Sequence, residues 1–308
     1  MRPRADLVLV GITVLWGSTF VVTKELVREI APLPYLLVRF GVAAVVMLIL
    51  YWRRLPGSRS LLRDGVLLGL MNAVGLLLQV FGQAYTTVAK SSFITSLNTP
   101  LTPVVALLIY RTRPSKPQRA AVIIASGGLL LLTWPGTGAR WNAGDLVTIG
   151  CAVLYAFTIV ELARRTARSA DLIALSAVQV ITAAVLFGVC LLATRVLLSQ
   201  VAFDRLPEMI RLEARPFAPS RLAIVEMLYM AIVCTVVTFA GQTWAMSKLS
   251  ATHAAIIFAL EPVFATAMAI GLSGTAEWPG ARGGVGALLV MVAVVVSEIR
   301  LPRRRAAS

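Results

Sequence analysis

One carboxylate, Glu261, lies close to the centre of an apolar run over residues 252–273 and is followed directly by Pro262. An ionised carboxylate inside a membrane is costly unless it faces a cavity or a partner. A proline inside a helix leaves a backbone carbonyl without its usual hydrogen bond. Glu261 could therefore bind a substrate or exchange protons. The alternative is a structural carboxylate that accepts hydrogen bonds from backbone amides at the break.

The apolar run over residues 90–110 has a matching interruption, because Asn98 and Pro100 lie at the depth of Glu261 and Pro262. Helices that are interrupted at corresponding positions of two halves indicate the binding site of a carrier. We therefore expect Asn98 and Glu261 at one site, and a gating or structural role for Pro100 and Pro262.

Arg39 is a charged residue within the apolar run over residues 32–52. Its long side chain could reach the membrane surface. It could also pair with Glu261 or with the carboxylate of a substrate. We favour a structural or gating role for Arg39 over direct binding.

Further polar and aromatic residues occupy matching positions in the two halves of the chain. Gln83 matches Gln242, and Trp16 matches Tyr155 near the middle of its run. In lipid such polar side chains must point inward, where they either line a cavity or hydrogen-bond neighbouring helices. The aromatic pair suits an amphipathic ligand, with packing as the alternative. The candidate cavity residues are Trp16, Ser18, Gln79, Gln83, Asn98, Tyr155, Gln242 and Glu261.

The composition indicates that membrane helices carry these residues. Of 308 residues, 58% are hydrophobic and only 14% are charged, and the mean hydropathy is +0.84. Soluble domains have about 45–50% apolar and about 25% charged residues. Unpaired backbone groups are excluded from lipid, so apolar runs of about 20 residues must be helices. The ten runs are 6–27, 32–52, 64–85, 90–110, 118–135, 144–163, 171–194, 222–246, 252–273 and 281–299. Within the longest connection, 195–221, residues 206–214 predict a short amphipathic helix on the membrane surface.

The net charge of +15 comes from short basic clusters between the apolar runs. Nucleic-acid binding would require a continuous basic face, so we expect no nucleic acid as a partner. Basic loops stay on the cytoplasmic side of a membrane. This pattern predicts a multi-pass protein of the cell inner (cytoplasmic) membrane with both termini cytoplasmic.

An internal repeat organises the chain into two halves, residues 5–135 and 144–299. The first run of each half aligns in one register, with Asp6 matching Asp145. Lys90 and His253 also match; both begin a helix, and we expect a surface or capping role for them. Five runs per half is an odd number, so the second half must enter the membrane from the opposite side. The fold class is therefore an all-α polytopic membrane protein with ten transmembrane helices as two inverted five-helix repeats, a transporter architecture.

Four motifs of the sequence resemble those of the drug/metabolite transporter superfamily, in its ten-helix branch with two EamA-type repeats. The motifs are Leu15–Phe20, Arg39–Phe40, Gly82–Ile94 and Ala259–Ala265, and the resemblance covers residues 5–300. It implies a secondary transporter of small metabolites by alternating access, often an exporter of amino acids or related compounds.

Two other classes of protein remain as alternatives. An intramembrane enzyme would need catalytic motifs, but the chain has no GxSxG, and its single histidine excludes HExxH. A scaffold or signalling subunit would need a larger soluble region. The cysteines, Cys151, Cys190 and Cys234, lack metal-ligand spacing. We expect no catalytic residues, metal or cofactor. The expected partners are a small-molecule substrate, the lipid bilayer and, as a candidate coupling ion, the proton, in a monomer or weak homodimer.

Overall fold

The computed structural model describes residues 2–54, 58–86, 88–133, 141–273 and 280–299, and all regular elements in these ranges are helices. The first half contains α1 (Arg2–Glu29), α2 (Pro32–Tyr51), η1 (Trp52–Arg54), α3 (Arg59–Tyr85), α4 (Val88–Ser96), α5 (Asn98–Tyr110) and α6 (Lys116–Thr133). The second half contains α7 (Ala143–Thr166), α8 (Leu172–Gln200), η2 (Phe203–Arg205), α9 (Glu208–Leu212), α10 (Arg221–Ala231), η3 (Ile232–Val237), α11 (Thr238–Met246), α12 (Ala251–Phe258), α13 (Glu261–Ser273) and α14 (Gly280–Ser297).

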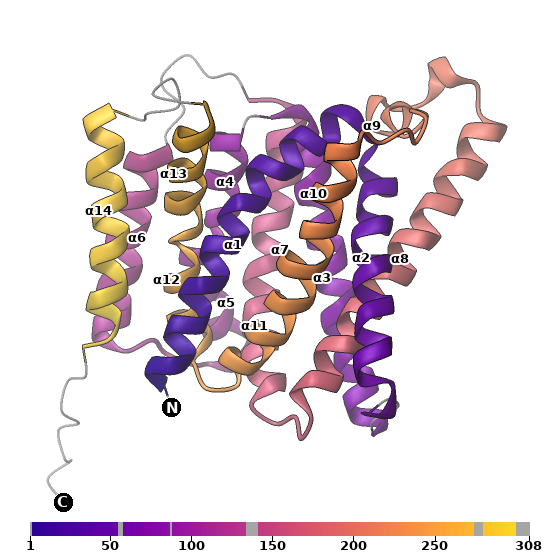
Figure 1. Ribbon diagram of the computed structural model, residues 1–308. Helices are drawn as coiled ribbons and strands as arrows, with labels where there is room; N and C mark the ends of the chain where they lie inside the picture. The colour runs from indigo at the N-terminus through magenta and orange to yellow at the C-terminus, as the bar shows by residue number, and fades with distance from the viewer. Residues whose placement is uncertain (1, 55–57, 87, 134–140, 274–279, 300–308) are drawn as a thin grey trace, which may run out of the picture.

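The helices fit the expectation of a polytopic membrane protein. Within the described ranges, nine stretches are long and apolar enough to cross a membrane. The remaining long helix, α6, has 18 residues and begins with Lys116, Pro117, Gln118 and Arg119, which dilute its apolar character. It packs along α14, so it runs through the same layer (Figure 1). The ten predicted runs thus correspond to helices, and the predicted surface helix at 206–214 appears as the shorter α9.

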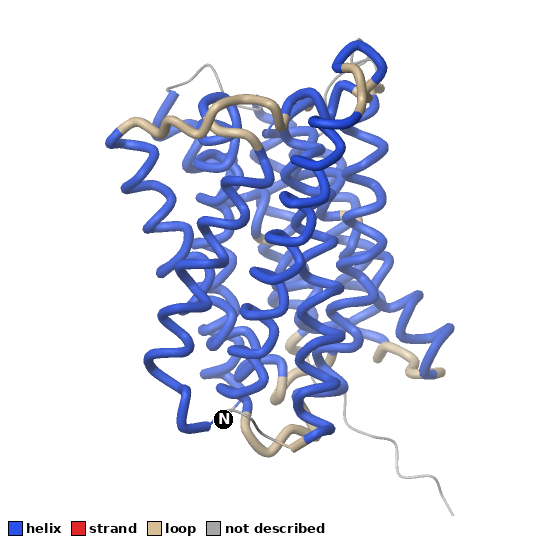
Figure 2. Tube along the Cα trace, turned by 90° about the vertical axis from the view of Figure 1, so that its right-hand side faces the viewer, coloured by secondary structure: helices blue, strands red, loops and turns tan. Residues whose placement is uncertain are grey.

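The helices run between two faces of the molecule (Figures 1 and 2). We call the face that carries the start of α1 and the end of α14 the terminal face. We call the opposite face, which carries α9 and the segment 201–220, the loop face. The terminal face also carries the α7–α8 and α11–α12 connections (Figure 1).

The two halves exchange equivalent contacts. Helix α1 of the first half packs on α11, α12 and α13 of the second, while α7 of the second half packs on α3, α4 and α5 of the first. The second helices, α2 and α8, pack on each other, and so do the last ones, α6 and α14. This reciprocal pattern is what an inverted repeat would produce. The repeat boundaries at 5–135 and 144–299 stay a prediction, and most of the link between them lies outside the described residues.

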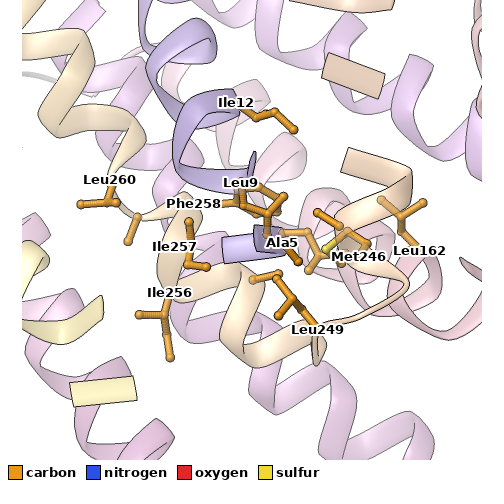
Figure 3. Close-up of a cluster of buried hydrophobic side chains, with 14 of the residues drawn as sticks. Ala5, Leu9, Ile12, Leu162, Met246, Leu249, Ile256, Ile257, Phe258 and Leu260 are labelled. Carbon is orange, nitrogen blue, oxygen red and sulfur yellow. The ribbon is translucent and has the colours of Figure 1, made fainter. Parts of the chain in front are cut away.

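A buried apolar cluster closes the bundle toward the terminal face (Figure 3). It joins the start of α1 to the end of α7, to α11 and to α12. Its labelled members are Ala5, Leu9, Ile12, Leu162, Met246, Leu249, Ile256, Ile257, Phe258 and Leu260. Two of them, Leu162 and Phe258, also line the central cavity described next, so this cluster forms the cavity's floor on that side.

Candidate functional site: a central cavity between the halves

A cavity lies at the interface of the two halves. A volume of about 70 Å³ is open there to the centres of water molecules, whereas one water needs about 10–15 Å³. The walls come from helices of both halves. The lining residues are Trp16, Thr19, Arg39, Asn72, Leu76, Gln79, Asn98, Tyr155, Thr158, Ile159, Leu162, Phe239, Gln242, Phe258 and Glu261.

Two interrupted helices meet at this cavity. The fourth membrane crossing breaks at Leu97, so that Asn98 begins α5, and the ninth breaks after Phe258, so that Glu261 begins α13. The interruptions expected within the runs 90–110 and 252–273 are therefore present, and each run forms two helices. The Thr99 hydroxyl donates to the carbonyl of Ala255 at 3.1 Å and joins the two crossings directly. Broken helices at matching positions of two repeats are a feature of carrier binding sites.

Arg39 is held rigidly in the wall of the cavity and is only 4% exposed. Its guanidinium donates to the Thr235 hydroxyl at 2.9 Å, to the Tyr35 hydroxyl at 3.2 Å and to the Cys234 carbonyl at 3.2 Å. Two of these acceptors, Thr235 and Cys234, lie in η3, a π-helical turn that leaves carbonyls available in an otherwise α-helical crossing. The position deep inside the bundle excludes the alternative that Arg39 reaches the membrane surface.

Glu261 lines the same cavity from the other half. In the described part of the chain, its carboxylate has neither a hydrogen-bond donor nor a basic partner within ion-pair distance, and Arg39 has no acidic partner. A carboxylate that only satisfied the helix break would accept backbone amides there. The cavity therefore holds one basic and one acidic group that are not paired with each other.

Aromatic and amide side chains complete the walls. The Trp16 and Phe258 rings lie 5.4 Å apart between centroids. The Tyr155 hydroxyl donates to the Gln79 side-chain oxygen at 3.3 Å. Two turns earlier on α3, Asn72 donates to Gln179 at 3.4 Å. These groups surround the two charges with surfaces for an apolar body and for neutral hydrogen bonds.

Most of the predicted residues converge on the cavity. Six of the eight candidates line it: Trp16, Gln79, Asn98, Tyr155, Gln242 and Glu261. The structure places Ser18 and Gln83 elsewhere. Ser18 bonds the Tyr229 hydroxyl at 2.8 Å, and Gln83 is buried nearer the loop face, where its backbone carbonyl accepts from Lys24 at 2.6 Å. Pro100 and Pro262 are not among the lining residues.

The candidates from the sequence omit several lining residues, most of them apolar. Thr158, Ile159 and Leu162 lie three, four and seven residues after Tyr155. This helical spacing places them on the same face as Tyr155, so the face could have been found from that aromatic residue. Phe239, Phe258 and Leu76 carry no such signal, because an apolar residue in an apolar helix looks the same whether it lines a cavity or packs in the core.

Comparisons with known proteins agree with the architecture. The EamA-like transporter family matches the chain over residues 3–134 and again over residues 142–298. An uncharacterized transporter of Archaeoglobus fulgidus is 26% identical, covering 97% of this chain and 87% of its own length. The uncharacterized transporter YyaM of Bacillus subtilis is 24% identical, covering 96% of this chain and 95% of its own.

Two further proteins are similar over most of the chain. The uncharacterized inner membrane transporter YedA of Escherichia coli (strain K12) is 24% identical over 89% of this chain and 86% of its own length. A protein of known crystal structure superposes with a TM-score of 0.73 at 16% identity, over 97% of each chain, which supports the fold alone. Because both halves of the chain match one family, this protein is a membrane protein that belongs to the EamA-like transporter family.

Proposed function

We propose that this protein is a secondary transporter that moves a small zwitterionic metabolite, of the amino-acid class, across the cytoplasmic membrane by alternating access. The observation that carries the proposal is the pair of unpaired charges, Arg39 and Glu261, on the wall of one cavity. A ligand that carries one carboxylate and one ammonium group would satisfy both charges and remain neutral overall.

The geometry of the two groups suits this class of ligand. A guanidinium that is already fixed by three acceptors presents a planar donor surface to a carboxylate. The Glu261 carboxylate has its acceptor capacity free for an ammonium group. Trp16 and Phe258 offer apolar surface for a side chain. Arg39 would then bind the substrate in addition to having the structural or gating role that its position in the sequence suggests.

We also propose a route and a direction for the transport of the substrate. A ligand that bridges Arg39 and Glu261 contacts both halves, so it would favour a state in which the halves close around it. The basic clusters favour the terminal face as the cytoplasmic one. Efflux is the direction that the family resemblance implies. A proton on Glu261 is the alternative occupant of the acidic position, which would couple transport to a pH gradient.

Flux in proteoliposomes tests the substrate class. We expect amino acids to exchange faster than amines without a carboxylate and faster than carboxylic acids without an amine. A hydrogen bond to a charged group contributes about 1.5–3 kcal/mol, so Arg39→Gln and Glu261→Gln should each lower the flux at least about tenfold. Ser18→Ala is the matched control, because Ser18 lies on α1 but outside the cavity.

Two readouts separate binding from folding. Thermal stability in detergent should remain near that of the parent for Glu261→Gln, which loses no internal bond. Glu261→Gln should also lose the preference for amino acids over carboxylic acids without an amine. If protons couple transport, this variant should lose the acceleration by a pH gradient while exchange continues. Undiminished flux in both charge variants would exclude the cavity as the binding site.

A further inference from the structure

A second group of charges lies outside the cavity, at the terminal face. His253 on α12 is fully buried, and its Nε2 lies 2.9 Å from an Asp6 oxygen on α1 and 2.6 Å from a Glu298 oxygen after α14. Its Nδ1 lies 3.2 Å from the Ser297 hydroxyl. The surface or capping role expected for this histidine side chain is wrong, because α1 and α14 cover it.

The hydrogen-bond network shows which form of the imidazole fits. The Ser297 hydroxyl donates its proton to the Val294 carbonyl at 2.7 Å, so toward Nδ1 it can only accept. The two carboxylates at Nε2 are acceptors as well. Both ring nitrogens therefore face acceptors, and only the doubly protonated imidazolium can donate from both. A neutral ring would leave one nitrogen lone pair opposed to an oxygen lone pair.

The matching position of the first half holds a similar pair at the loop face. Lys90 on α4 lies 2.6 Å from Asp145 on α7. Lys90 is the repeat partner of His253, and Asp145 is the repeat partner of Asp6. Each pair thus joins the first helix of one half to the fourth crossing of the other, at opposite ends of the molecule. We call Lys90–Asp145 the loop-face latch and Asp6–His253–Glu298 the terminal-face latch.

These connections lie where the halves would have to separate. Trp16 on α1 and Tyr155 on α7 line the cavity, so opening it to either face requires α1 or α7 to move away from the crossing that it touches. Moving α1 from α12 separates Asp6 from His253, and moving α7 from α4 separates Asp145 from Lys90. Both latches are closed in this structure, in which the cavity floor is also sealed by the apolar cluster.

Among the described residues, the elements around α12 differ in the side chains that they bring toward His253. Around α12, helices α6, α11 and α14 contribute apolar residues of the buried cluster, among them Ala121, Ala125, Met246 and Val290. A separate pocket beside the first turn of α12 is lined by the titratable or charged side chains of Tyr110, Arg113, Arg164 and Arg168. The acidic groups that face the ring are Asp6 from α1 and Glu298 after α14.

We propose that the terminal-face latch is a proton-binding site: a proton from water binds the imidazole of His253, completes its ionic contacts with Asp6 and Glu298, and holds the terminal face closed. When the proton leaves, this face opens more readily. The loop-face latch has a lysine in place of the histidine. The inference rests on the proposed alternating-access function. A His–carboxylate set can also hold a divalent cation. We favour the proton over a metal ion because Lys90, the repeat partner of His253, is a positively charged side chain that contacts an acid.

Thiol labelling from the terminal face tests the latch. All variants are made in a protein in which the three native cysteines are replaced. This protein also carries Glu213→Gln, which removes the buried acid at the loop face other than Asp145. A single Thr19→Cys reports access to the cavity. The rate of labelling by a membrane-impermeant reagent is measured from about pH 5.5 to about pH 8.5. We define the labelling ratio as this rate divided by the rate of a His253→Gln variant at the same pH. The division cancels the effect of pH on the ionisation of the thiol.

The expected ratio is near one at the alkaline end and falls to about one tenth at the acidic end. His253→Lys should keep the ratio low at every pH, because its charge is permanent. Lys90→His is the matched control: labelling from the loop face should then acquire the pH dependence that it lacks in the parent.

Three results would overturn the proposal. They are a ratio that does not change with pH, a Lys90→His variant whose loop-face labelling ignores pH, or terminal-face labelling that follows added zinc and chelator instead of pH. The assay needs no substrate. A pH-dependent ratio in a protein that fails to exchange amino acids would retain the latch and reject the proposed substrate, so the two proposals can fail separately.

Discussion

The two latches occupy equivalent repeat positions but differ in how they are built. At the loop face, Asp145 is fully buried and accepts from Lys90 at 2.6 Å, from the Thr86 hydroxyl at 2.6 Å and from the Asn142 backbone amide at 3.0 Å. At the terminal face, the Asp6 side chain is 20% exposed and the Glu298 side chain is 40% exposed, and they share one imidazole.

This difference shows that backbone pseudo-symmetry does not make the two faces chemically alike. The repeat places an acid on the first helix and a base on the fourth crossing in both halves. Burial and base type then differ. The loop face has a buried, multiply bonded contact, while the terminal face has the contact that, in our proposal, a proton strengthens. A carrier with this asymmetry can respond to pH on one face only.

Removing the acid from each latch should give the largest contrast. Asp145→Asn leaves Lys90 facing a neutral group in a buried site, and breaking a buried pair in this way costs about 3–5 kcal/mol. Asp6→Asn should cost less than about 1 kcal/mol, because its side chain is partly exposed and Glu298 still faces the imidazole. Unfolding of both variants in detergent checks this, and equal losses would break the comparison.

Adding one methyl group to each of two matching glycines should give the next largest contrast. A Cβ on Gly82 would collide with the Thr148 hydroxyl and the Gly144 carbonyl on α7, whereas one on Gly241 meets the flexible end of Ile12 at 3.3 Å. We expect Gly82→Ala to cost about 1–3 kcal/mol of stability and Gly241→Ala to be nearly neutral. Similar melting temperatures for the two variants would show that the halves pack equally tightly at both positions.

Glu213 at the loop face sharpens the comparison, because burial raises the pKa of its carboxyl to about 7. It accepts from the Leu33 amide at the start of α2. Between about pH 4.5 and about pH 7, the folded protein holds a proton that the unfolded chain has lost. Stability should therefore fall by up to about 3 kcal/mol as the pH rises through this window and level off above it. Glu213→Gln should remove this contribution to the dependence on pH, and an unchanged slope would assign it to another group.

The smallest expected effect is that of Ser297→Ala. The variant removes the acceptor for Nδ1 of His253, and a typical hydrogen bond contributes about 1 kcal/mol. The midpoint of the labelling ratio should move about 0.7 unit toward acidic pH, with little change in melting temperature. A shift toward alkaline pH would mean that Ser297 opposes the imidazolium.

The helices and most of the site could be predicted from the sequence, because long apolar runs and polar residues within them are strong local signals. Glu261 and Asn98 were found through their proline neighbours. The position of His253 could not be predicted, because the residues of α12 from Thr252 to Phe258 are all buried and no polar face of the helix marks which side chain meets a partner. The network of Arg39 depends on the π-helical turn at 232–237, whose residues, Ile-Val-Cys-Thr-Val-Val, carry no such signal.

Distances across both faces, measured by pulsed electron paramagnetic resonance on the full chain, connect the latches to transport. One spin-label pair, at Arg4 and Lys248, spans the terminal face between α1 and the α11–α12 connection, and a second pair, at Glu25 and Trp141, spans the loop face between α1 and the start of α7. We predict that His253→Gln lengthens the first distance and leaves the second short, and that Asp145→Asn does the reverse. Distances that lengthen together at both faces, or that ignore both substitutions, would contradict a carrier that opens one face at a time.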